Sequence, residues 1–162
     1  WPLASEAVRA RLAARRGDIE EAVRRLETTF IGLRTDPWPI EFLMERSLRL
    51  AQEIAAKNPG MASRLLEAMK EPFSTRVYES IRTEILVDLA SKIGVEAAVG
   101  YVAAYEPNPV WTYEFLSYRL ACYERVGHPY EELARRDLAE FSMAAPERLA
   151  DSLGSATRIG GR

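Results

Sequence analysis

The sequence predicts an all-α fold built from about four antiparallel helix hairpins, and three observations support that prediction. Four of the nine prolines are spaced 35 residues apart: Pro2, Pro37, Pro72 and Pro107. Turn-forming residues fall inside each interval. Elsewhere apolar residues recur at three- and four-residue steps, and no stretch alternates apolar and polar residues over the length of a strand.

The prolines divide the chain into four units, 2–36, 37–71, 72–106 and 107–141. Proline lacks an N–H and restricts the residue before it, so it suits the first turn of a helix and ends the preceding one. Three of the prolines follow an acidic residue (Asp36, Glu71 and Glu106), which can face the N-terminus of the next helix. We therefore expect the first helix of each unit to begin close to its proline.

Turn residues inside the units separate the two helices of each hairpin. They are Gly17-Asp18, Asn58-Pro59-Gly60, Gly94 and Gly127-His128-Pro129. The expected helices cover residues 3–16, 18–34, 38–57, 60–70, 73–92, 95–105, 110–126 and 130–143. Aromatic residues recur at helix spacings, and we interpret them as packing residues between hairpins; the alternative is that some of them are binding anchors. They are Trp38, Phe73, Tyr101, Tyr105, Trp111, Tyr118 and Tyr123.

These helices form one expected domain, residues 1–143, followed by a C-terminal tail, residues 144–162. The tail is rich in Gly, Ser and Ala, and we expect it to dock along the last hairpin as a cap. The sequence leaves open whether the hairpins stack as a regular α-solenoid or pack as a compact bundle.

A unit of two helices with a period near 35 residues resembles the tetratricopeptide repeat. The clearest local match is residues 10–30, ARLAARRGDIEEAVRRLETTF, with Gly17 at the turn and Ala22 where the two helices would cross. Residues 123–141, YERVGHPYEELARRDLAEF, are similar with one extra turn residue, and Ala134 takes the place of the crossing alanine. The resemblance covers roughly residues 2–141.

The resemblance implies a scaffold or adaptor that binds a protein segment in a groove lined by the first helices of its hairpins. Arginine can grip carboxylates with two parallel hydrogen bonds, so an arginine-lined groove would suit an acidic or C-terminal peptide. The candidate partner-binding residues on the first helices are Arg46, Arg49, Arg82, Tyr113, Tyr118 and Arg119. The alternative for the arginines is ordinary surface pairing, as at Glu45–Arg49 or Glu53–Lys57.

Composition narrows the function further. With 22 basic and 24 acidic residues, the net charge is −2. Nucleic-acid-binding proteins usually carry an excess of basic residues, so this composition argues against nucleic-acid binding. A single Cys and a single His exclude an internal disulfide and any site that needs two imidazoles. We expect no metal and no cofactor. No apolar run reaches the length of a membrane helix and no signal segment is visible, so we expect no membrane insertion and a cytoplasmic location.

Two alternatives concern catalysis. Cys122 and His128 could form a thiol–imidazole pair, but we interpret them as a buried thiol and a turn residue. The chain could also be an accessory helical domain of a larger enzyme, with a small-ligand pocket lined by Tyr78, Glu79 and Arg82. We expect a non-catalytic protein, because no convergent set of catalytic groups appears in the sequence.

Overall fold

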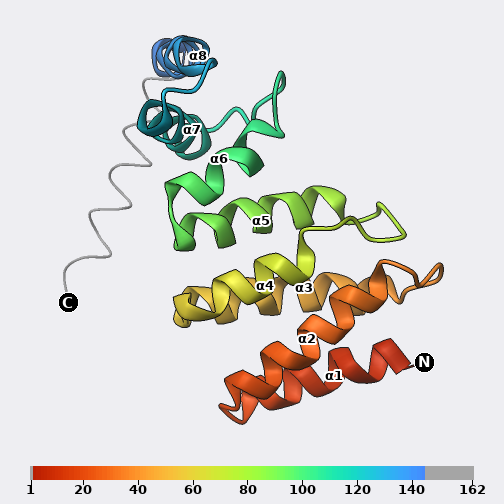
Figure 1. Cartoon of the computed structure of the whole chain (residues 1–162). Coiled ribbons are helices and arrows are strands. Elements are labelled where there is room, and N and C mark those ends of the chain that lie inside the picture. Colours follow the sequence, from red (N-terminus) through yellow and green to blue (C-terminus); the bar gives the residue numbers. More distant parts are fainter. Residues whose placement is uncertain (1, 145–162) are drawn as a thin grey trace. The chain divides into compact units, whose positions relative to one another are not determined.

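The computed structural model describes residues 2–144, in which helices are joined by turns and loops and no strand is present (Figure 1). The all-α prediction is therefore confirmed for these residues. The α-helices are α1 (Pro2–Arg15), α2 (Ile19–Leu33), α3 (Glu41–Lys57), α4 (Ala62–Met69), α5 (Glu79–Ile93), α6 (Val95–Ala103), α7 (Tyr113–Val126) and α8 (Glu131–Ala144), with a short 3-10 helix, η1 (Pro59–Met61), before α4. None of these helices is long and apolar enough to cross a membrane.

The turns inside the hairpins lie where the sequence predicts them. Gly17 has a φ of 81° between α1 and α2, and Gly127 has a φ of 64° between α7 and α8. Both values fall in the left-handed region that favours glycine. Asp18 caps α2, because its Oδ1 accepts a hydrogen bond of 3.1 Å from the backbone N–H of Glu21.

The prediction that each proline lies close to the start of a helix is right for Pro2, which opens α1, and wrong for the other three. Pro37, Pro72 and Pro107 lie within the loops 34–40, 70–78 and 104–112 that join the hairpins. The 70–78 loop shows the reason. Its Phe73 is buried, with its ring 5.9 Å from the ring of Phe30, so tertiary packing holds the loop in an extended path.

The chain divides into two compact units, with the boundary inside α6 between Tyr101 and Val102. In the first unit, α1 packs on α2 and on α3, α3 packs on α5, and α4 packs on both α2 and α5. Its core is a single cluster of apolar side chains that includes Leu26, Phe30, Leu48, Leu65 and Ile85. Burying this apolar surface is the main force that holds the helices together.

In the second unit, α7 and α8 form an antiparallel hairpin. Ala134 is fully buried, as is Ala22 in the first unit, which agrees with the small residues predicted at the helix crossings. The predicted docking of the tail falls on residues 145–162, which lie outside the described residues.

Candidate functional site

Three adjoining hollows follow the seam between α1 and α3 in the first unit. Their volumes are about 440, 280 and 490 Å³. Ala7 and Leu43 line both the first and the second, and Arg11 and Arg46 line both the second and the third. The hollows therefore adjoin one another along the seam, and we call them together the α1/α3 groove.

The two helices run in the same direction along this groove. One end is lined by the start of α1 and by residues 39–44, at the start of α3. The other end is lined by Arg15 and Ile19 beside Lys57 and Asn58, where both helices finish. The groove thus has an N-terminal end and a C-terminal end, and the two ends differ in chemistry.

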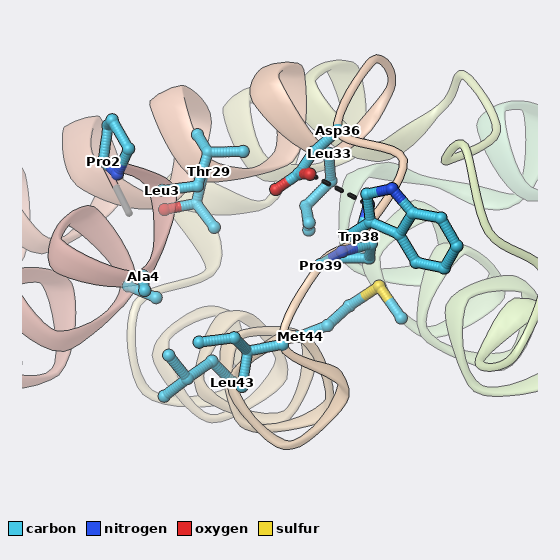
Figure 2. Close-up of a pocket in the computed structure, with 12 residues that line it drawn as sticks. Pro2, Leu3, Ala4, Thr29, Leu33, Asp36, Trp38, Pro39, Leu43 and Met44 are labelled. Carbon is cyan, nitrogen blue, oxygen red and sulfur yellow. Dashed lines mark hydrogen bonds between the residues drawn. The ribbon is translucent and has the colours of Figure 1, made fainter.

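The N-terminal end is apolar (Figure 2). Leu43 and Met44 of α3 line one side, while Thr29 and Leu33 of α2 line another. The remaining lining residues are Pro2, Leu3, Ala4, Ala7, Asp36, Trp38, Pro39 and Ile40, among which Asp36 is the one charged side chain. A Cβ at Gly32 would overlap the side chain of Leu3, so the glycine lets α1 approach α2 closely here.

Trp38 lies on the rim of this apolar hollow and is 88% exposed. The interpretation of Trp38 as a packing residue between hairpins is therefore wrong. Pro37 and Pro39 flank it and hold it in the loop between α2 and α3, and its backbone N–H donates a 3.0 Å hydrogen bond to Asp36 Oδ1. A large aromatic ring in water next to an apolar hollow is a typical feature of a binding surface.

The C-terminal end of the groove is basic. Five cationic side chains line it with one carboxylate, that of Glu53; the five are Arg11, Arg15, Arg46, Arg49 and Lys57. Within residues 2–144, none of Arg11, Arg15 and Arg46 has a carboxylate within ion-pair distance. The guanidinium of Arg46 lies 4.0 Å from the centre of the Phe42 ring, a cation–π contact that leaves its N–H groups available.

Neither of the two example surface pairs, Glu45–Arg49 and Glu53–Lys57, is formed, although Arg49 does pair with another carboxylate. Among the described residues Arg49 does not pair with Glu45; it lies 3.8 Å from Glu84 and hydrogen-bonds to Gln52. Lys57 and Glu53 do not pair either, although both line the groove. The cations of the groove are therefore poorly neutralised by the protein itself.

The helix dipole explains part of this distribution. Arg15 and Lys57 lie in the last turns of α1 and α3, where cations are favoured by the carbonyl ends of the helices. That effect fades within one turn, so it does not account for Arg11 or Arg46, which lie further back along the helices. Their position in the groove needs another explanation.

Arg82, a predicted site residue, is buried and lies outside the groove. Its Nη1 donates to the carbonyl oxygens of Met69 and Lys70, at 2.5 and 3.2 Å. These two residues lie at the end of α4. Its Nε and Nη2 bind the carboxylate of Glu79 at 2.9 and 2.6 Å. Because nearly all of its donors are used within the protein, Arg82 serves to cap α4 and anchor α5 on it.

Arg119, another predicted site residue, is 0% exposed in the second unit. Its Nε and Nη2 bind Glu106 at 2.7 and 3.0 Å, and its Nη1 binds Asp137 at 2.8 Å. The hydroxyl of Tyr123 donates to Glu106 at 2.8 Å. Burial by itself lowers the pKa of Arg119, but the bonds to Glu106 and Asp137 outweigh it and raise the pKa above its usual value.

The other two predicted site residues, Tyr113 and Tyr118, are half-buried on α7 in the second unit. The α1/α3 groove therefore brings together two of the six predicted residues, Arg46 and Arg49. Sequence reasoning missed Arg11 and Arg15, and it included Trp38 only through the alternative in which some of the aromatics are binding anchors. Val8, Arg11 and Arg15 recur at three- and four-residue steps on the first helix, and that spacing is the signal that could have found the two arginines.

Cys122 and His128 have the structural roles expected of them. Cys122 is fully buried, and this burial raises the pKa of its thiol. The ring of His128 stacks on Tyr123 with 4.2 Å between ring centres, and its Nδ1 accepts a 3.2 Å hydrogen bond from the backbone N–H of Tyr130. A buried, poorly ionised thiol is a weak nucleophile.

Comparison of the chain with models of protein families, with curated proteins and with solved structures gives no match.

Proposed function

We propose that this protein is a non-catalytic binding module that holds a segment of a partner protein in the α1/α3 groove. The observation that carries the proposal is the groove itself, in which an apolar hollow adjoins a row of cations. Three of these cations, Arg11, Arg15 and Arg46, form no ion pair within residues 2–144. Apolar contacts would supply most of the affinity, and the cations would supply orientation and selectivity. Such a module would act as a scaffold or as a subunit of an assembly.

The packing of the first unit supports this role. Helices α1, α3 and α5 lie in that order, each packed on the next, while α2 and α4 also pack together. This order is what a tetratricopeptide-like array would have, and such an array binds its partner on the face made by its first helices. The groove lies on that face.

The alternative proposal, a small-ligand pocket around Tyr78, Glu79 and Arg82, has less support. The guanidinium of Arg82 is held by the carbonyl groups of α4 and by Glu79, so it has little left to offer a ligand. A substrate there would have to displace contacts that end one helix and anchor another.

Site-specific photo-crosslinking tests the proposal. A benzoylphenylalanine placed at Val8, which lines the groove and is 56% exposed, would cross-link a partner in cells that produce the protein. The matched control places the same group at Ser63, an exposed position at the start of α4 outside the groove. We expect a discrete cross-linked protein from position 8 and none from position 63. Equal labelling from both positions, or none from either, would reject the groove as the binding site.

A further inference from the structure

The chemistry of the α1/α3 groove also specifies its occupant. We propose that the groove binds an acidic, amphipathic segment of a partner protein, whose carboxylates lie against Arg11, Arg15 and Arg46 and whose apolar side chains fill the hollow beside Trp38. This inference rests on the proposed function, because it names the partner class of the same site. Charge complementarity and the order of the two halves of the groove carry it.

Like charges gathered on one surface repel one another, and an anionic occupant relieves that repulsion. The basic half of the groove holds five cations and the carboxylate of Glu53. The planar guanidinium groups present paired donors that match a carboxylate. Arg11 and Arg46 are the best placed, because neither is held by an ion pair within the described residues and neither lies in the last turn of its helix.

The apolar half of the groove indicates that the anionic groups bound by the basic half belong to a protein segment. The hollow beside Trp38 is bounded mainly by aliphatic side chains and contains one negative charge, that of Asp36. A phosphate backbone would find no cation there, whereas a Leu or Phe side chain would be removed from water by the walls and by the exposed indole ring. The net charge of −2 also opposes binding to nucleic acid.

The chain's own C-terminal residues do not complement the groove. Residues 145–162 contain three arginines and two carboxylates, so their net charge has the same sign as the basic half. Residues 145–162 are therefore not the occupant that we propose. The 14 residues of α1 span about 21 Å, so a helical occupant of about the same length covers the groove.

The parallel course of α1 and α3 sets the direction of such a helix. Both carbonyl ends lie at the basic end of the groove. A partner helix that runs antiparallel to them places its own N-terminus there, which is the favourable alignment of helix dipoles. Acidic residues also stabilise the first turn of the helix that carries them. We therefore expect the acidic half of the segment to come first in its sequence and the apolar half to follow.

A selection from random peptides of about 14 residues displayed on phage tests this inference on the full chain. We expect the enriched peptides to carry an acidic N-terminal half and Leu, Phe or Trp in the C-terminal half. Selection on the R11Q/R15Q/R46Q variant should lose the acidic bias. The control variant R9Q/R24Q/R76Q removes the same charge from residues outside the groove and should keep it.

Anisotropy titrations with one enriched peptide then give magnitudes. The R11Q/R15Q/R46Q variant should bind about tenfold more weakly, as should W38A, while the control variant should bind within about twofold of the wild type. The same peptide with its sequence reversed should bind about tenfold more weakly. Thermal unfolding of the same variants separates loss of binding from loss of structure. Because none of Arg11, Arg15 and Arg46 forms an ion pair within residues 2–144, we expect the R11Q/R15Q/R46Q variant to melt close to the wild-type temperature.

The outcomes separate the two proposals. Enriched peptides that are neutral or basic, or an oligothymidylate that competes as well as the acidic peptide, would overturn the acidic occupant. If position 8 still cross-links a partner protein, the proposed function survives that result. A selection without enrichment, together with no cross-link at position 8, would overturn both.

Discussion

The buried Arg119 network predicts a large loss of stability when one of its carboxylates is neutralised. The carboxylate oxygens of Glu106 lie 2.7 Å from Nε and 3.0 Å from Nη2 of Arg119. Glu106→Gln keeps the shape of the side chain but removes this negative charge. Asp137 remains as the other carboxylate, so the buried guanidinium is left only partly compensated. The hydroxyl of Tyr123 also loses the carboxylate that accepts its hydrogen bond.

The magnitude follows from burial. Side-chain exposures are 0% for Arg119, 8% for Glu106 and 11% for Asp137, so water can replace little of the lost charge. Breaking a buried pair by removing one partner costs about 3–5 kcal/mol. Because the amide oxygen of Gln still accepts one hydrogen bond, we expect about 3 kcal/mol, which corresponds to a rise of about a hundredfold in the unfolding equilibrium constant of the second unit.

Urea unfolding followed by Trp111 fluorescence measures this loss in a W1F/W38F background, where the one remaining tryptophan lies in the second unit. The control is Glu124→Gln. Glu124 binds Arg135 at 2.9 Å with side chains 43% and 49% exposed, so its removal should cost less than about 1 kcal/mol. If the two variants differ by less than about 1 kcal/mol, burial does not govern the strength of the Arg119 network and the reasoning is refuted.

Three further predictions test other parts of the fold. Gly17→Ala should lower the stability of the first unit by about 1 kcal/mol, because φ is 81° at this position. Gly60→Ala is the control in thermal unfolding and should not lower it, because an added Cβ has as much room there and φ is not in the left-handed region. The hydrogen bond from Arg82 lowers the pKa of Glu79 below its usual 4.5, so its contribution to stability is complete above that value and is lost as the pH falls through the lowered pKa. Glu79→Gln should therefore flatten the decline in melting temperature of the first unit below about pH 4.5, and an unchanged slope would contradict this assignment. Cys122 should react with a thiol reagent only as fast as the second unit opens, so Glu106→Gln should accelerate the reaction, and a rate equal to that of an exposed thiol in the wild type would contradict its burial.

The helices and their turns could be predicted because their signals are local. Gly17 and Gly127 adopt left-handed backbone conformations, and Asp18 caps α2, all within a few residues of the turn. The starts of the first helices were harder to predict. α5 begins at Glu79 and not near residue 73, because Phe73 leaves the helical path to stack on Phe30, a contact between residues far apart in the sequence.

The candidate site was predicted only in part, for a similar reason. Arg46, Arg82 and Arg119 all lie on first helices, and nothing next to them in the sequence distinguishes a groove arginine from a buried one. The difference comes from distant partners. Arg82 meets the carbonyl groups that end α4, and Arg119 meets Glu106 and Asp137 from outside its own helix, whereas Arg46 meets no carboxylate among the described residues.

The near-zero net charge of the chain conceals a segregation of charge that the fold creates. In the first unit, carboxylates of α2 are used by neighbouring cations. Glu20 and Glu27 both bind Arg64 of α4, at 2.7 and 2.8 Å. The α2/α4 side is thereby neutralised, and the α1/α3 side keeps an excess of cations around Arg11 and Arg46. A charge balance taken over the whole sequence therefore argues against nucleic acid but says nothing about a local anionic partner, because the affinity of a groove depends on which charges the fold leaves unpaired.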